Sequence, residues 1–110
     1  MNRKIVYQGS GQKWAINLNP IDGVTMDDYD FEVDIYCAPL LAKTKMITVP
    51  KNQTRRINEN SYVVRLFTTE LGTGDLWLRV RAYLPDPDFN DGIRPEVLYF
   101  DTGLYLAAPL

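Results

Sequence analysis

Hydrophobic and polar residues alternate along most of this chain, and a period of two residues is the pattern of β-strands. In the segment 30–37, Phe31, Val33 and Ile35 fall on one face, and the acidic side chains fall on the other. The segment 76–84 repeats this pattern, with every second residue apolar from Leu76 to Leu84. Both segments are predicted to be strands with one face in a core and the other facing solvent or a partner.

Weaker alternation predicts five more strands, at residues 4–8, 12–18, 45–49, 61–67 and 97–106. About seven strands separated by turn residues predict an immunoglobulin-like antiparallel β-sandwich, formed by residues 1–110 as a single domain. Gly9-Ser10-Gly11 is expected to join the first two strands as a tight hairpin. One helical turn is expected at residues 68–71, where the chain crosses between sheets, and the polar segment 51–60 is expected to be an edge or a loop.

The composition excludes several classes of function. The 110 residues include 12 Lys and Arg against 14 Asp and Glu, so the basic excess typical of nucleic-acid binders is missing. There is no His, which removes the commonest general base and metal ligand, and a single Cys cannot supply an internal disulfide or a zinc site. We therefore expect no catalytic residue, no metal and no cofactor, and a protein that is not an enzyme.

Asp101-Thr102-Gly103 is the sharpest match to a catalytic motif, because it resembles the Asp-Thr-Gly run of aspartic proteases. A homodimeric protease would need one copy per chain, with the two aspartates sharing a proton. In that family most of the chain follows the motif, whereas only seven residues follow Gly103 here. A bend in the last strand, with Asp101 on its solvent side, is the favoured interpretation, and the protease is a third alternative.

The loop 85–92 contains Asp86, Asp88 and Asn90, which alternate like the first ligands of a calcium loop. The glycine and the glutamate of such a loop are out of register here, at Gly92 and Glu96. The segment is therefore interpreted as an acidic hairpin loop stiffened by prolines, and Asp88 and Phe89 at its tip are candidate interface residues.

Trp77, Arg79, Arg81 and Tyr83 are expected on the outer face of one strand, with Arg65 across from them. Arginine between aromatic residues is typical of interface hot spots. It also fits a ladder in which the arginines pair with Asp30, Glu32 or Asp34 on a facing strand, and both interpretations stay open. A carbohydrate-binding or adhesive module is the second functional alternative, with Trp77, Tyr83 or Tyr99 stacking on a sugar.

The C-terminal residues Ala107, Ala108, Pro109 and Leu110 are apolar, and they are expected to pack on their own domain or on a neighbour. Together with the aromatic-arginine face and the loop tip, they form the predicted interface. We expect other assembly proteins as partners and a homo-oligomer or many copies in one assembly, with no nucleic acid and no membrane.

The order of these features resembles small β-sandwich domains of tailed-phage and prophage virion proteins, found in baseplates, tails and capsid accessories. The resemblance rests on the turn Gln8-Gly9-Ser10-Gly11, the strand 14–18, the acidic segment 27–30, and the segments 71–76 and 85–97. It implies a structural or attachment role, made in a host cytoplasm and acting in the virion. Larger relatives continue into a fibre or receptor-binding part. Because the sequence ends at Leu110, the resemblance favours a capsid-decorating protein or a tail or baseplate adaptor.

Overall fold

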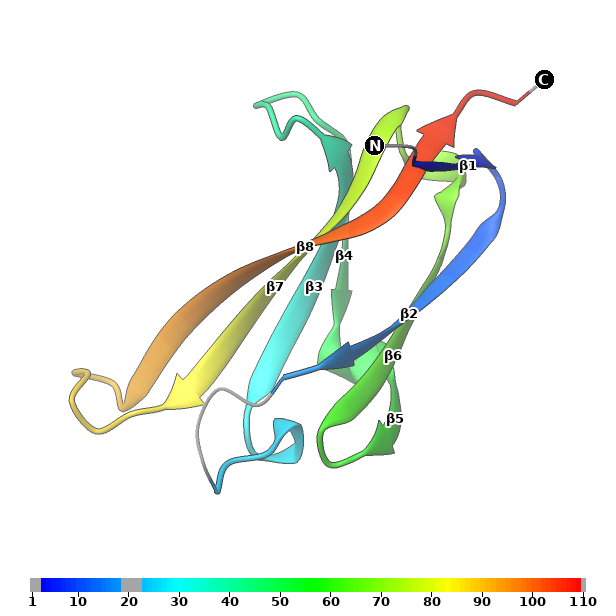
Figure 1. Cartoon of the computed structure of the whole chain (residues 1–110). Coiled ribbons are helices and arrows are strands. Elements are labelled where there is room, and N and C mark those ends of the chain that lie inside the picture. Colours follow the sequence, from blue (N-terminus) through cyan, green and yellow to red (C-terminus); the bar gives the residue numbers. More distant parts are fainter. Residues whose placement is uncertain (1–2, 19–22, 110) are drawn as a thin grey trace.

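The computed structural model describes residues 3–18 and 23–109, which form β-strands and short 3-10 turns (Figure 1). The strands are β1 (Lys4–Tyr7), β2 (Gly11–Asn17), β3 (Asp30–Ala38), β4 (Met46–Pro50), β5 (Arg55–Asn58), β6 (Ser61–Phe67), β7 (Gly74–Pro85) and β8 (Ile93–Ala107). The turns are η1 (Met26–Asp28), η2 (Lys51–Gln53) and η3 (Thr68–Glu70). Among the helical turns described, none is long and apolar enough to cross a membrane.

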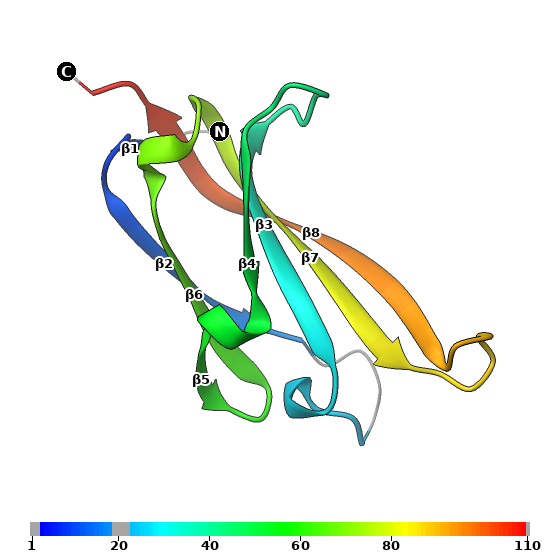
Figure 2. The same ribbon diagram turned by 180° about the vertical axis from the view of Figure 1, so that it is seen from behind.

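The strands form two sheets that face each other like the layers of a sandwich (Figures 1 and 2). Five strands form the first sheet in the order β1-β8-β7-β3-β4, and three form the second in the order β2-β6-β5. The predicted all-β class is therefore confirmed. The predicted turn at residues 68–71 is also confirmed as η3, and it lies where the chain crosses from β6 in one sheet to β7 in the other.

The core lies between the sheets and is built by the alternating residues. Phe31, Val33 and Ile35 of β3 are fully buried, and Ile16 and Val64 reach them from the second sheet. The edge of the Phe31 ring meets Tyr62 of β6, with ring centroids 5.3 Å apart and an interplanar angle of 82°. This T-shaped contact is a favourable geometry for two aromatic rings, and here it joins the two layers.

The expectation of a purely antiparallel sandwich was wrong at the N-terminus. β1 runs parallel to β8, with Lys4 opposite Leu104 and Tyr7 opposite Ala107. Gly9-Ser10-Gly11 therefore does not close a hairpin. Instead it carries the chain from β1 in the five-stranded sheet to β2 in the three-stranded sheet. Glycine permits the turn, since Gly9 has φ of 95°, but the turn sequence alone does not reveal which strand pairs with β1.

The expectation that residues 51–60 form a polar edge or a loop is confirmed as an edge, because the segment contains η2 and the short strand β5, which is the last strand of the three-stranded sheet. β5 is exposed along its whole length, so it has no alternating apolar pattern to detect. Lys51, the first residue of η2, has a structural role that a polar pattern does not predict. Its Nζ donates to the carbonyl oxygens of Met26 at 2.8 Å and Tyr29 at 2.7 Å, and it lies 5.7 Å from the centroid of the Phe31 ring.

Candidate functional site: two complementary surfaces

The outer face of the five-stranded sheet carries the arginines predicted as interface residues. Cross-strand pairing places Arg79 and Arg81 of β7 opposite Asp34 and Glu32 of β3. Asp34 is fully buried. Its Oδ2 accepts from Arg79 Nε at 2.7 Å and from Arg81 Nε at 2.9 Å, and its Oδ1 accepts from Thr48 Oγ1 at 2.7 Å. These contacts support the interpretation of this face as a ladder of ion pairs between neighbouring strands.

The same ladder fixes the position of Tyr83, because its hydroxyl donates to Glu32 Oε1 at 2.8 Å. Arg81 Nη2 also lies 3.2 Å from Glu32 Oε2. Trp77 is half-buried and pairs with Tyr36 of β3, and Tyr99 of β8 is 55% exposed beside Arg79. Arg65 does not lie across from this face, contrary to expectation, because β6 belongs to the other sheet.

The electrostatics of Asp34 follow from these contacts. Burial alone would raise the pKa of its carboxyl, but hydrogen bonds from Thr48, Arg81 and Arg79 outweigh burial and hold the pKa below its ordinary value. Asp34 is thus a buried carboxylate kept ionised by two guanidinium groups. With its charges paired internally, this face offers little unpaired charge to a partner.

The Asp-Thr-Gly motif lies at a β-bulge in β8. The register between β7 and β8 shifts between the pair Asp75 and Tyr105 and the pair Trp77 and Asp101, and Gly103 has φ of 76°. Asp101 is exposed and forms an ion pair with Arg3, whose Nη1 lies 2.8 Å from Oδ2. The hydrogen bond from Arg3, together with that from the Gly103 N–H, lowers the pKa of Asp101 to about 2. This environment favours an ionised carboxylate rather than one that shares a proton.

Asp27 is a further paired carboxylate, and the sequence did not indicate its pairing. Arg56 of β5 contacts it at 2.8 Å and the Tyr62 hydroxyl donates to it, so that η1 is held against the three-stranded sheet. The hydrogen bonds from Arg56 and Tyr62 lower the pKa of Asp27 to about 2.

We expect acid to destabilise the protein mainly between pH 4 and pH 2. The folded-state pKa values of Asp27, Asp34 and Asp101 lie below the ordinary value of 3.8, so the unfolded chain binds more protons in this window. The stability that these carboxylates contribute is present above pH 4 and is lost as pH falls through their folded pKa values. Melting temperatures from circular dichroism at pH 7, 4, 3 and 2 would measure this.

The paired substitution Asp27→Asn with Asp101→Asn is the control for the acid effect. This double variant should have a lower melting temperature than the wild type at pH 7. Its melting temperature should also fall less between pH 4 and pH 2, because it lacks two of the three carboxylates with a lowered pKa. A wild-type melting temperature that stays constant across this window would contradict the assignment.

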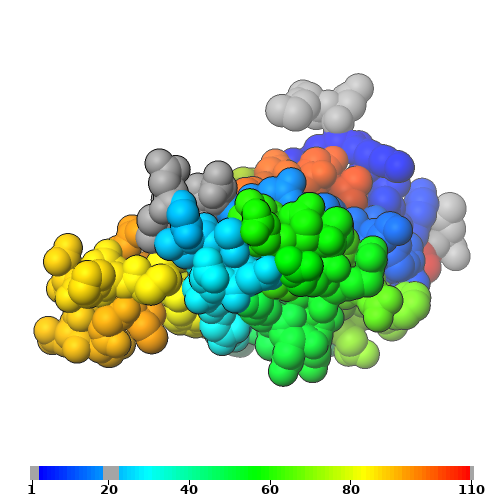
Figure 3. Space-filling view, turned by 90° about the horizontal axis from the view of Figure 1, so that it is seen from below, coloured from blue at the N-terminus to red at the C-terminus, as the bar shows by residue number. Residues whose placement is uncertain are grey.

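The predicted loop tip protrudes from one end of the molecule as the β7–β8 hairpin (Figures 1 and 3). We call residues 85–92 the hairpin tip. Asp86 N donates to the Gly92 carbonyl oxygen at 2.9 Å, and Asp86 Oδ2 lies 3.1 Å from Arg94 Nε. Asp88 and Asp91 are exposed, and Phe89 is 44% exposed. Within the described residues, no group of three or more Cys, Asp or Glu side chains is arranged to hold a metal ion.

The C-terminal residues end beside β1. Ala107 is the last residue of β8 and pairs with Tyr7, and Ala108 and Pro109 are exposed. Leu110 lies outside the described residues. Ile5 and Tyr105, which pair across β1 and β8, expose 56% and 39% of their surface. We call Ile5, Tyr7 and Tyr105 the terminal patch.

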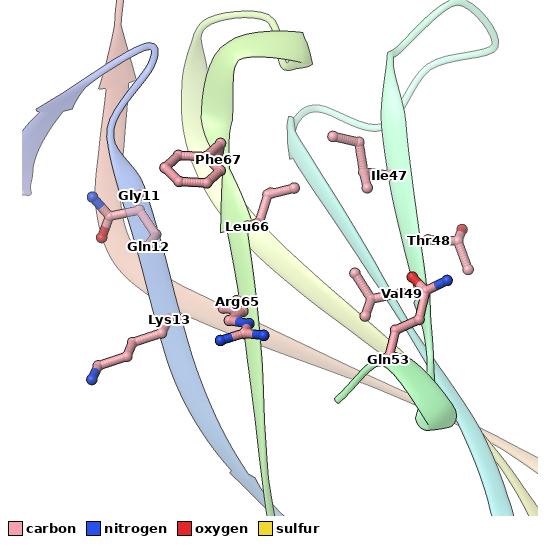
Figure 4. Close-up of a pocket in the computed structure, with 10 residues that line it drawn as sticks. All are labelled: Gly11, Gln12, Lys13, Ile47, Thr48, Val49, Gln53, Arg65, Leu66 and Phe67. Atoms are coloured by element: carbon pink, nitrogen blue, oxygen red, sulfur yellow. The ribbon is translucent and has the colours of Figure 1, made fainter. Parts of the chain in front are cut away.

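A groove with a volume of about 600 Å³ lies between β4 and β6 (Figure 4). The sequence did not indicate this groove, because the groove lies between two strands, β4 and β6, that belong to different sheets and do not pair. β4 is the last strand of its sheet, and β5 pairs with β6 only at residues 61–63, which leaves the segment 65–67 without a neighbour on that side.

The β4–β6 groove is lined by apolar side chains and by two cationic residues, Lys13 and Arg65. Leu66 of β6 points toward Ile47 of β4 (Figure 4). Phe67, which is 73% exposed, lies over Gly11 of β2, and Lys13 and Arg65 occupy opposite positions in the register of β2 and β6. The groove therefore combines apolar surface with two like charges.

No family model, curated protein or solved structure matches this chain.

Proposed function

We propose that this protein is a non-enzymatic structural or attachment component of a virion or phage-like particle, acting as a capsid-decorating protein or as a tail or baseplate adaptor. The observation that carries the proposal is the exposure of large apolar side chains on projecting parts of a small molecule, at the terminal patch and at the hairpin tip. Exposed apolar surface of this kind marks sites of protein association.

We further propose that the sandwich is immunoglobulin-like. The strand order supports this, because β2-β6-β5 corresponds to the B-E-D order of that fold and β4-β3-β7-β8 corresponds to C′-C-F-G. β1 differs from the constant-type arrangement by joining the sheet of β8 rather than that of β2. In such a sandwich the loops and edges are free to vary, which suits a module that packs among other subunits.

Internal pairing of the charged groups also supports a role without catalysis. Asp27, Asp34 and Asp101 each have an arginine partner within the described residues. A carboxylate held in this way has a pKa far below neutrality and is a poor general acid or base at pH 7.

The proposal is tested by isolating particles on density gradients from cells that carry the gene, and by measuring the copy number of the protein in them by mass spectrometry. We expect multiple copies per particle. The variant Ile5→Ser with Tyr105→Ser should be incorporated at least about tenfold less, since it removes the apolar surface of the terminal patch.

Leu41→Ser is the matched control for this variant. Leu41 is 65% exposed in the loop between β3 and β4, away from β1 and β8, and its substitution should leave incorporation unchanged. Purified particles that lack the wild-type protein altogether would overturn the proposed function.

A further inference from the structure

We propose that the hairpin tip of one copy of this protein docks into the β4–β6 groove of a second copy. This inference deepens the proposed function, on which it rests, by naming a second copy of the chain as one partner. Three observations carry it: the charges of the two surfaces, the fit of an aromatic side chain to the groove, and the placement of the two surfaces on the molecule.

Each surface carries two charges that form no ion pair within the described residues, and the two pairs of charges are opposite in sign. Asp88 and Asp91 on the hairpin tip form no ion pair there, and neither do Lys13 and Arg65 at the groove. Lys13 and Arg65 are opposite each other in the register of β2 and β6, so two cationic residues lie on neighbouring strands at the groove. Two carboxylates brought beside them would find oppositely charged partners.

The apolar parts of the two surfaces also match. Phe89 lies on the hairpin tip with 44% of its surface exposed, and Leu66, Ile47 and Val49 are among the residues that line the groove. A volume of about 600 Å³ accommodates an aromatic ring together with part of its loop. An aromatic anchor in an apolar pocket with charges at the border is the usual composition of an interface centre.

The hairpin tip is preorganised by hydrogen bonds and prolines within the loop. Hydrogen bonds within the loop link Asp86 to Gly92 and Gly92 to Phe89, both at 2.9 Å, and prolines at 85 and 87 restrict its backbone. A loop that is already ordered loses less conformational entropy on binding.

The placement of the surfaces requires the contact to be intermolecular. The tip lies at the far end of the β7–β8 hairpin, while β4 and β6, which border the groove, lie in the body of the sandwich (Figures 1 and 2). The molecule is 51 Å long, and a hairpin paired along its length cannot bend back to its own groove. A contact between two different surfaces is heterologous, so it generates a ring if the rotation closes and a filament if it does not.

Charge reversal on each surface tests the proposal. Variant T carries Asp88→Lys and Asp91→Lys, and variant G carries Lys13→Glu and Arg65→Glu. In T both surfaces are positive, and in G both are negative, so each variant alone should be monomeric by light scattering at concentrations where the wild type associates. We expect the dissociation constant of each to rise at least about tenfold.

Mixing T and G should restore association, because every tip then meets a groove of opposite charge. The restored association should weaken with added salt, as charged contacts do. Circular dichroism of each variant shows whether it is folded, and rescue in the mixture is itself evidence that both variants fold.

The control pair is Glu59→Lys with Glu70→Lys and, separately, Lys43→Glu with Lys45→Glu. These variants change the net charge by the same amounts as T and G at exposed residues outside the two surfaces, and each should associate like the wild type. A wild type that stays monomeric at millimolar concentration, or a mixture of T and G that fails to associate, would overturn the proposal. Particle incorporation that persists in T and G would then leave the proposed function intact.

Discussion

Replacing Asp34 with Asn is expected to lower the free energy of unfolding by about 3 kcal/mol, because it leaves two buried arginine contacts without their counter-charge. Asp34 is fully buried, and Arg79 and Arg81 approach the same Oδ2 atom. Asn keeps the size of the side chain but turns one acceptor into a donor that faces guanidinium N–H groups. Urea denaturation followed by fluorescence would measure the change.

Asp91→Asn is the matched control for Asp34→Asn. Asp91 is exposed on the hairpin tip and forms no ion pair within the described residues, so the same chemical change should cost less than about 0.5 kcal/mol there. If Asp34→Asn lowered the free energy of unfolding as little as Asp91→Asn, the ladder on the outer face would contribute little to stability.

Phe31→Ala is expected to destabilise the protein by about 4 kcal/mol, because it opens a cavity between the two sheets. Phe31 is fully buried, and its ring contacts Tyr62 of the other sheet. The cation of Lys51 lies against the same ring, so part of the cost comes from loss of that contact. Thermal and urea denaturation would give the free energy.

The natural control is Phe67→Ala, the same truncation at a side chain that is 73% exposed. It should cost less than about 1 kcal/mol in the isolated protein, since little apolar surface is buried there. If Phe67→Ala were as destabilising as Phe31→Ala, the assignment of Phe31 as the contact that joins the layers would be wrong.

Strand positions were predictable wherever one face is buried. The segments 30–37 and 76–84 alternate clearly because Phe31, Val33, Leu78 and Val80 all enter the core while their neighbours do not. The segment 51–60 could be predicted only as a polar edge or loop, because every residue of β5 is exposed and no alternation marks it as a strand. The first residues of β8, at 93–96, were missed because none of them is buried and they adjoin the hairpin tip.

The pairing of distant strands could not be predicted from local patterns. Gly9-Ser10-Gly11 has the composition of a hairpin turn, but the partner of β1 lies at the other end of the chain. The β4–β6 groove was missed similarly, because it depends on how far β5 extends along β6. Local residue types fix which segments become strands, and the edges that stay open follow only from the assembled sheets.

The parallel pairing of β1 with β8 has a consequence for how this protein is made. Arg3 and its partner Asp101 are 98 positions apart in the sequence, and the hydrogen bonds of β1 also depend on residues 104–107. A ribosome that has synthesised the first strand must still make the last one before the two can meet. Non-local pairing of this kind slows folding, and until β8 arrives the apolar side chains of β1 have no sheet to join. The nascent chain therefore completes its fold only after its final strand has left the ribosome.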